Sequence, residues 1–466
     1  MAWDPQGNGR TSIRASYGIT YNHYPTVDRL GSQSAMPPYG SLTRVLSPAG
    51  GLDDPWRGIA GGNPFPFVID KNMPFVPFGE YLIGNPDLTP TYDQSWNLSI
   101  QREVATGTLL SVSYIGTKIT HLQAAEPLNM AIYVPGVGDA NGNCFLNGRV
   151  THFKVAAGSA CSMVANTQDR RALSFLNPAF SNEIGRLATV TNGGNQSYNG
   201  MLVSVQHRPN QRINLNANYT WSHCIGDYQA RSNNGFGASV DHTYQDPNNR
   251  QRDRGNCEID QRHAFNLTGV GETPKFANRT LSLVGTGWRL SGIYRVSTAG
   301  TIVPTSQSSG MRTVTLGSAS GSNASATSSA AADRCLCDIS GQRPNQVLAN
   351  VYLDTSGRPN TQWLNPAAFA PPALGTLGNM GRATLRLPLA WQFDMAVSRV
   401  FRFRESQRME FRAEAYNVLN SFRPGVPPGS PNSAQVVDTN LSSSQFGKIR
   451  LSLEPRILQF ALKYLF

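Results

Sequence analysis

The alternation of apolar and polar residues is clearest at the end of the chain. One face of the last segment is apolar throughout, at Leu458, Phe460, Leu462, Tyr464 and Phe466. The other face carries Gln459, Ala461 and Lys463, with Leu465 as the exception. A period of two predicts a β-strand. Soluble proteins avoid such an apolar terminal edge, whereas an outer-membrane β-barrel turns it toward lipid. The last strand of a secreted β-sandwich is the alternative.

The same alternation recurs along the whole chain. It predicts further strands at residues 11–22, 92–103, 107–116, 197–208, 211–223, 262–271, 288–297, 391–403 and 408–419. With the terminal strand, this makes about ten strands and an all-β, antiparallel fold. We therefore interpret residues 1–466 as a single domain that forms part of a transmembrane β-barrel.

The connections between these strands alternate in length. Tight turns are predicted near residues 104, 209 and 404, and a medium connection near 280. Long loops are predicted at about 23–91, 117–196, 224–261, 298–390 and 420–456, the last with a short hairpin around 448–453. Bacterial outer-membrane barrels have short periplasmic turns and long outer loops. The final strand would then end in the periplasm.

Composition narrows the class of protein. Hydrophobic residues make up 39% of the chain, mean hydropathy is −0.32, and no run approaches the roughly 20 apolar residues of a membrane-spanning helix. These values exclude a helical membrane protein and are compatible with a barrel. The net charge is +11. With no nucleic-acid-binding motif, this charge indicates basic loops and lumen rather than a nucleic-acid partner.

The six cysteines all fall in predicted connections. They are Cys144, Cys161, Cys224, Cys257, Cys335 and Cys337. An even number in loops indicates disulfides and an oxidising compartment. We expect Cys144 to pair with Cys161 and Cys224 with Cys257. A bond between Cys335 and Cys337 would be strained, so free thiols are the alternative there, and reduced cysteines are the alternative for all six.

No motif for covalent catalysis or nucleotide binding occurs, so we expect neither an enzyme nor a cofactor. A zinc site among residues 223–263 would use His223, Cys224, His242, Cys257 and His263. Their spacing matches no zinc pattern, and a disulfide is the preferred interpretation. A calcium site would use Asp241, Asp246, Asp253 and Asp260. These lack EF-hand spacing, and a solvated loop is preferred.

Two further groups of side chains fit a barrel. Glu410, Arg412 and Glu414 share the polar face of one predicted strand and are expected to pair with neighbouring strands. Aromatic residues lie near predicted strand ends, where they suit interfacial girdles. These are Tyr219, Trp221, Trp288, Trp391, Tyr464 and Phe466. Core aromatics of a sandwich are the alternative.

Several segments, taken in order, resemble one known family. They are AWDP at 2–5, SIRASYGI at 12–19, NPDLTP at 85–90, WNLS at 96–99, residues 161–171 from Cys-Ser to Arg-Arg, DQRH at 260–263, NPAAF at 365–369, residues 375–382, FRAE at 411–414 and NVLN at 417–420. Together they resemble the C-terminal barrel of TonB-dependent outer-membrane receptors. The similar branch is Oar-like, and its full members carry a carboxypeptidase-regulatory-like domain.

The resemblance implies a barrel of about 22 strands around a plug, importing a small, unidentified ligand. Its partners would be TonB, acting through an N-terminal region, the barrel-assembly machinery, acting on the terminal strand, and outer-membrane lipid. Residues 1–10 are polar and are no signal peptide, and no TonB box or plug is recognised. We therefore expect either that Met1 is internal to a longer reading frame or that another chain completes the barrel. A passive porin-like or adhesive barrel and a soluble carbohydrate-binding β-protein are the alternatives.

Overall fold

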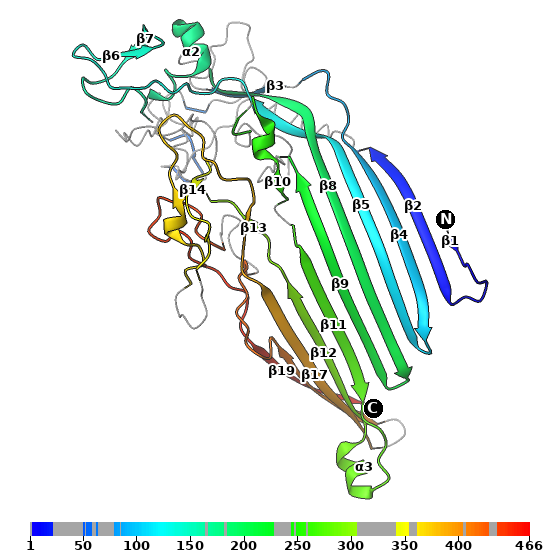
Figure 1. The fold of residues 1–466 in the computed structure, drawn as a ribbon. Helices are drawn as coiled ribbons and strands as arrows, with labels where there is room; N and C mark the ends of the chain where they lie inside the picture. The colour runs from blue at the N-terminus through cyan, green and yellow to red at the C-terminus, as the bar shows by residue number, and fades with distance from the viewer. Residues whose placement is uncertain are drawn as a thin grey trace.

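The structure is a computed structural model, dominated by one large sheet (Figure 1). It describes residues 2–21, 50–51, 53–57, 62–63, 79–83, 85–163, 166–180, 184–227, 244–246, 248–257, 260–304, 342–353, 361–403, 407–427 and 436–466. Within these residues the main sheet has 13 strands. No helix among them is long and apolar enough to cross a bilayer.

The long strands follow one another across the sheet in chain order. They are β2 (Thr11–Tyr21), β4 (Tyr92–Ala105), β5 (Thr108–Pro127), β8 (Ile184–Asn210), β9 (Ile213–Gly226), β11 (His263–Glu272), β12 (Trp288–Ser297), β17 (Ala390–Arg402), β18 (Arg408–Tyr416) and β19 (Ile457–Leu465). Each pairs antiparallel with the next, and β1 (Ala2–Trp3) extends the sheet beside β2. The result is an up-and-down meander.

The remaining elements lie in the connections. Short strands are β3 (Gly79–Ile83), β6 (Asn143–Leu146), β7 (Arg149–Lys154), β10 (Gly255–Asn256), β13 (Thr301–Ile302), β14 (Asn345–Gln346), β15 (Phe369–Ala370) and β16 (Leu385–Arg386). Helical elements are α2 (Ala172–Leu176), α3 (Arg279–Gly285) and the 3₁₀ turns η2 (Pro178–Phe180), η3 (Arg250–Asp253) and η4 (Pro366–Ala368). The strand β3 joins the start of β8 in parallel, and β10 pairs with β9.

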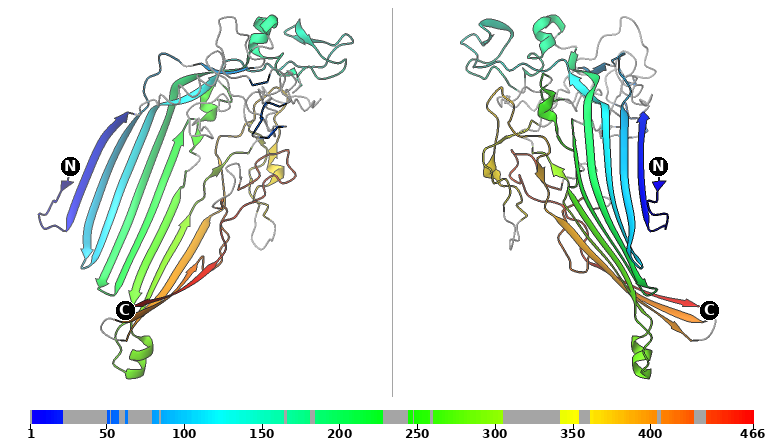
Figure 2. Two further views of the ribbon diagram at one scale, coloured as in Figure 1. Left: turned by 180° about the vertical axis from the view of Figure 1, so that it is seen from behind. Right: turned by 45° about the vertical axis from the view of Figure 1, so that its right-hand side comes forward.

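The connections are sorted between the two ends of the sheet (Figure 2). The turns after β4 and β8 lie at one end with the C-terminus and α3, and the elements β6, β7, α2 and β14 of the long connections lie at the other (Figures 1 and 2). Gly107 lies in the turn after β4 with φ of +71°, and a Cβ there would lie 2.3 Å from the Arg208 carbonyl oxygen. Only glycine fits this turn without displacing the backbone of β8.

All ten predicted long strands are present, but some predicted bounds are wrong. Residues 117–127 and 184–196 extend β5 and β8 rather than belonging to a loop, because the two strands keep pairing as far as Pro127 and Ala188. The turn predicted at Pro209-Asn210 lies at residues 211–212. The last predicted hairpin is reduced to isolated bridges at Pro424–Ser452 and Val437–Ile449.

Strand β18 ends at Tyr416, earlier than predicted. Asn417 has a left-handed backbone with φ of +49°, which breaks the extended conformation. Its N–H donates to the Asp394 carboxylate at 2.8 Å rather than to a strand neighbour. The segment from Asn417 to Leu419 therefore leaves the regular strand pairing, although the Val418 N–H still donates to the Phe393 carbonyl of β17 at 2.8 Å.

The two faces of the sheet differ in polarity. Directly paired residues share a face, so the register carries each face across the strands. One row of paired residues is apolar throughout, at Ile100, Val112, Val203, Tyr219, Phe265, Val296 and Trp391. The row one position along is polar throughout, at Gln101, Ser111, Ser204, Asn218, Asn266, Arg295 and Gln392. The sheet thus has one apolar face and one polar face.

The apolar face is exposed. On β19, Leu458, Phe460 and Leu462 have 60%, 69% and 67% of their surface accessible. The larger buried apolar cluster lies instead in the connections, at Leu364, Ala368, Phe369, Met380, Leu385, Val437, Phe446 and Ile449. A water-soluble sheet would have its apolar face covered. This face is arranged for an apolar surrounding.

Aromatic residues lie toward both ends of the apolar face. Tyr219 and Trp391 belong to one row near the long connections, whereas Trp288 and Phe401 lie near the short turns. Trp391 and Phe401 are ten positions apart on β17. Ten residues span about 33 Å along a strand, or about 25 Å across a membrane at a tilt of about 40°. That height matches the apolar band of an outer-membrane barrel.

Candidate functional site

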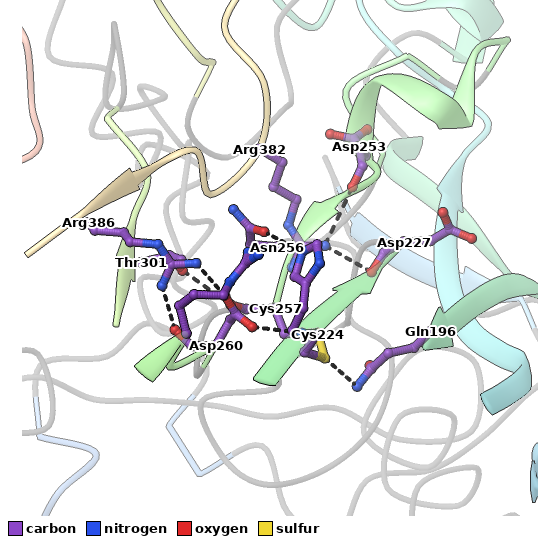
Figure 3. The surroundings of a disulfide bond; sticks show 12 residues. Gln196, Cys224, Asp227, Asp253, Asn256, Cys257, Asp260, Thr301, Arg382 and Arg386 are labelled. Atoms are coloured by element: carbon purple, nitrogen blue, oxygen red, sulfur yellow. Dashed lines mark hydrogen bonds and ion pairs between the residues drawn. A yellow bond between two sulfur atoms is a disulfide. The ribbon is translucent and has the colours of Figure 1, made fainter. Parts of the chain in front are cut away.

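A disulfide marks the place where the long connections meet the sheet (Figure 3). Cys224 near the end of β9 is bonded to Cys257, which follows β10, with their Cα atoms 5.4 Å apart. The Cys257 N–H donates to the Cys224 carbonyl at 3.1 Å. The Cys224 N–H donates to the Asp260 carboxylate at 2.6 Å. The disulfide and these bonds fasten Cys257 and Asp260 onto β9.

Asp260 connects this disulfide to a distant part of the chain. Its side chain is 1% exposed and forms ion pairs with Arg386 of β16 and, at 3.6 Å, with Arg262. Arg386 also donates to the Asp260 backbone carbonyl at 2.8 Å. Figure 3 shows Arg386 and Thr301 reaching the 257–260 segment from the same side. Asp260 therefore holds β16 against the end of β9.

A second ion pair, between Arg343 and Asp253, is almost fully buried. Their side chains are 4% and 2% exposed, and Nη1 lies 2.6 Å from Oδ1. Arg343 also donates to the carbonyls of Met380 at 2.9 Å and Arg252 at 2.8 Å. Asp253 also accepts the Gln245 N–H at 2.7 Å. A buried pair is tolerated when other hydrogen bonds satisfy both partners, as they do here.

Arg382 completes the contact between these segments. It is 5% exposed and donates to the carbonyl of Asp227 at 2.9 Å (Figure 3). The backbones come so close that a Cβ on Gly255 would lie 2.2 Å from the Arg382 carbonyl oxygen. We call the contact of residues 250–260 with residues 343–346 and 378–386 the loop junction.

The loop junction continues into the buried apolar cluster. Met380 and Leu385 of the junction's 378–386 segment pack with Val437 and Ile449 from the connection between β18 and β19. The N–H groups of Trp363 and Leu364 donate to the Gly447 carbonyl at 2.9 and 3.1 Å. Three long connections, after β9, β12 and β18, are thereby joined into one folded structure.

The β6–β7 hairpin forms a separate structure in the connection between β5 and β8. It contains the disulfide between Cys144 and Cys161 and a small cluster with Val134 and Phe153. Arg170 is fully buried and donates to Asn166 Oδ1 and the Ile132 carbonyl, both at 2.9 Å. Its side chain links the two ends of this connection.

Asp139 fixes the turn that precedes β6. Its carboxylate accepts the backbone N–H groups of Asn141 and Asn143, each at 2.8 Å, and the Asn143 side chain at 3.0 Å. The hydrogen bonds from Asn143 favour the ionised carboxylate and lower the pKa of Asp139. The turn therefore keeps a negative charge at neutral pH.

The charged residues predicted on β18 pair differently from the prediction. Arg412 Nη2 lies 2.8 Å from Glu410 Oε1, and Arg412 Nη1 lies 3.6 Å from Glu414 Oε1. The three lie two positions apart on one strand and share its polar face, so they pair within the strand. The close ion pairs are therefore not the predicted ones between strands, although Glu410 does lie opposite Lys463 of β19 in the register. A close ion pair between strands joins Arg295 of β12 to Asp394 of β17, at 3.2 Å.

The structure gives other roles to the described candidates for metal binding. Cys224 and Cys257 form a disulfide, as do Cys144 and Cys161, and these are the two pairs that the sequence analysis names. His223 contacts Asn256 at 3.1 Å, and His263 contacts the Tyr219 hydroxyl at 2.8 Å. Asp253 and Asp260 face arginines. Asp246 accepts the N–H of Asn248 at 3.0 Å.

Four named candidates lie outside the described residues: Asp241, His242, Cys335 and Cys337. Among the residues that are described, no cluster of three or more His, Cys, Asp or Glu side chains could hold a metal ion. Sequence reasoning missed the arginines Arg343, Arg382 and Arg386. Two residues of the junction could have been singled out from the sequence, because Asp260 and Arg382 fall within segments that resemble the family.

The buried Tyr244 makes the loop junction sensitive to alkali. Its side chain is fully buried, with the Arg250 guanidinium 5.2 Å from the ring centre. Burial raises the pKa of Tyr244 to about 12, although Arg250 opposes the shift. An unfolded tyrosine has a pKa near 10. The contribution of the neutral Tyr244 side chain to the free energy of unfolding is therefore complete below pH 10. It is lost as the pH rises through about 12.

We expect the junction to lose about 2–3 kcal/mol between pH 10 and 12. Guanidinium unfolding curves at both pH values measure this loss, and Tyr244→Phe should remove most of it. Tyr21→Phe, at a strand position that is 68% exposed, serves as the control. An unchanged pH dependence in the Tyr244→Phe protein would contradict the assignment.

Comparison with known proteins identifies the family. The family described as "Outer membrane beta barrel domain" matches residues 1–459. No curated protein matches the chain. Similar solved structures include the outer membrane transporter YddB from Escherichia coli, at 10% identity and a TM-score of 0.43, covering 100% of this chain and 40% of that one. The FrpB iron transporter from Neisseria meningitidis is similar at 9% identity and a TM-score of 0.39, covering 100% and 38%.

The ferric enterobactin receptor PfeA from Pseudomonas aeruginosa is similar at 9% identity and a TM-score of 0.39, covering 98% of this chain and 38% of that one. The chain thus spans 40% or less of the length of these three structures.

The family match covers almost the entire chain, and the exposed apolar face, the height of the aromatic bands and the sorted connections agree with it. The chain belongs to the outer membrane beta barrel domain family, and its sheet is barrel wall of the outer membrane.

Proposed function

We propose that this chain supplies part of the barrel wall of a TonB-dependent receptor of the Oar-like branch. The observation that carries the proposal is the arrangement of the long connections. At one end of the sheet they are held by two disulfides and by buried ion pairs such as Arg343–Asp253. A passive pore has less need of fixed outer loops, whereas a receptor needs them to present a constant surface to its ligand.

The polar face supports the same function. Its serine, asparagine and glutamine side chains, such as Ser204, Asn218 and Gln101, suit a hydrated lumen or the polar surface of a plug. The ligand is a small molecule that the loops and lumen bind without covalent chemistry. No ligand, substrate or class of siderophore follows from these side chains, because none of them forms a selective site on its own.

The partners follow from the orientation. The short turns face the periplasm, and the long connections after β2, β5, β9, β12 and β18 face outward. TonB couples through the plug of the complete receptor. The barrel-assembly machinery binds the terminal strand, at Leu458, Phe460, Leu462, Tyr464 and Phe466. The family match argues against the soluble alternative, and a passive porin-like or adhesive barrel remains the rival.

Cysteine labelling in intact cells tests the proposal. Ser204→Cys on the polar face and Val203→Cys on the apolar face are made in a chain whose Cys335 and Cys337 are replaced by serine. A membrane-impermeant maleimide should label Ser204→Cys several-fold faster in energised cells than after a protonophore, because TonB opens the lumen. Val203→Cys, in lipid, should stay unlabelled in both states.

A cysteine at Val137, whose side chain is 59% exposed in a long connection, is the positive control and should be labelled in both states. Equal labelling of Ser204→Cys with and without the protonophore would support a passive channel and refute the TonB-dependent function. Labelling of Val203→Cys at the same rate as Ser204→Cys would refute the assignment of the two faces.

A further inference from the structure

A cavity of about 960 Å³ lies at the short-turn end of the sheet, between α3 and the end of β17. Aromatic and cationic side chains line it, including Phe276, Arg279, Arg399, Phe401, Arg402 and Phe403. None of the described residues that line it is acidic. Figure 1 shows α3 projecting beyond the short turns at this end. The cavity therefore combines positive charge with apolar walls at one border of the apolar face.

Arg399 connects the cavity to the apolar face. By register it pairs with Trp288 and Phe411, so it lies on that face. Its guanidinium donates to the carbonyls of Val284, at 2.8 Å, and Leu283, at the end of α3. It also lies 5.5 Å from the ring centre of Trp288 and 4.7 Å from that of Phe401. These contacts hold a positive charge at the membrane border without neutralising it.

The helix α3 presents apolar side chains beside this charge. Leu281, Leu283 and Val284 are 56%, 75% and 62% exposed. The Trp288 indole N–H donates to the Val284 carbonyl at 2.7 Å, which ties the helix to the aromatic band of the sheet. A short helix with exposed leucines beside a lipid-facing band lies at the depth of the headgroups. The exposed side chains of α3 are thus continuous with the lipid face.

A second cavity of about 380 Å³ lies nearby on the apolar face. Leu290, Tyr294, Phe393 and Met395 form its walls. It is lined almost entirely by apolar atoms and is open toward lipid. Leu290 follows Trp288 by two positions on the same face, so this groove begins beside the Trp288–Arg399 contact and runs toward the middle of the apolar band.

We propose that the two cavities together bind one anionic phospholipid. The phosphate lies against Arg279 and Arg399, whose guanidinium groups suit phosphate oxygens, and one acyl chain lies in the apolar groove. A phospholipid is the occupant that the positions favour, since its charged end belongs at the membrane border and its chain in the hydrocarbon. The site needs only the lipid-facing assignment. That its lipid comes from the periplasmic leaflet follows from the proposed orientation.

Native mass spectrometry of the full chain, purified from outer membranes in detergent, tests the site. Phosphatidylglycerol and phosphatidylcholine are added separately at equal concentrations. Each arginine near a membrane surface contributes about fivefold to the binding of an anionic lipid. Arg279→Gln should therefore weaken phosphatidylglycerol binding by about fivefold. Phosphatidylcholine binding should change little. Arg14→Gln, an exposed arginine on the polar face of β2, is the matched control.

Gly271→Leu tests the acyl-chain groove. Gly271 lines the groove, and a Cβ there would meet nothing within 4 Å, so the larger side chain fills the groove without disturbing the sheet. Binding of both lipids should fall several-fold, while Gly18→Leu, equally open but on the polar face, should bind as the wild type does. Heat-modifiable gel mobility confirms that each variant is folded. Undiminished phosphatidylglycerol binding in either test variant, or equal wild-type binding of the two lipids, would overturn the proposal.

Discussion

Replacing Arg343 by methionine should open the loop junction and leave the barrel sheet intact. The substitution keeps most of the side-chain volume but leaves the Asp253 carboxylate, 2% exposed, without its partner. Removing one member of a buried ion pair costs about 3–5 kcal/mol, because the remaining charge is desolvated and unpaired. The carbonyls of Met380 and Arg252 also lose a donor. We therefore expect cleavage by protease within residues 244–260 and 378–386 to accelerate by more than about a hundredfold.

A matched ion pair shows how much of this effect is due to burial. Arg254 lies 3.3 Å from Asp227, but its side chain is 38% exposed. Exposed pairs contribute about 0–1 kcal/mol. Arg254→Met should therefore accelerate cleavage no more than about fivefold. If Arg343→Met behaves like Arg254→Met, the loop junction is not held by its buried charges.

Removing the disulfide between Cys224 and Cys257 should have the second largest effect. The two cysteines are 33 residues apart in sequence. Closing a loop of that length stabilises the folded state by about 3–4 kcal/mol in the chain-entropy description. The double replacement by serine should release residues 255–260 from β9, because β10 contributes only two residues to the sheet. Protease cleavage within 244–260 measures this release.

The other disulfide provides an internal control. Cys144 and Cys161 are 17 residues apart and belong to the β6–β7 hairpin, outside the loop junction. Replacing them by serine should expose residues 143–161 to protease and leave cleavage within 244–260 unchanged. Opening of the junction by this second replacement would show that the two structures are coupled, contrary to their separate cores.

The long strands could be predicted because their signal is local. On β12, residues Trp288 to Ser297 were bounded correctly from alternation alone, since each side chain faces either the apolar or the polar surface. The identity of the sheet as barrel wall followed from the same pattern together with the order of long and short connections. The extension of β5 to Pro127 was missed because it depends on pairing with β8, about 60–80 residues away along the chain.

The loop junction could not be predicted, because its contacts join residues far apart in sequence. Arg343 meets Asp253 over 90 positions, and Arg386 meets Asp260 over 126. Arginine and aspartate in polar segments have no periodicity that would identify a buried partner. The helix α3 was likewise missed, since its seven residues are too few to show an amphipathic period. Its leucines do not distinguish a helix from an irregular connection near residue 280.

The measurement that tests the central claim most directly is the alternation of environment along β5 in a bilayer. Spin labels are placed singly at residues 109–116, and their relaxation by lipid-soluble oxygen and by a water-soluble nickel complex is compared. Labels at Leu110, Val112 and Tyr114 should be reached by oxygen, whereas those at Ser111 and Ser113 should be reached by nickel, because the faces alternate with a period of two. Equal access of both reagents along the strand would contradict the assignment of one face to lipid and the other to a hydrated lumen.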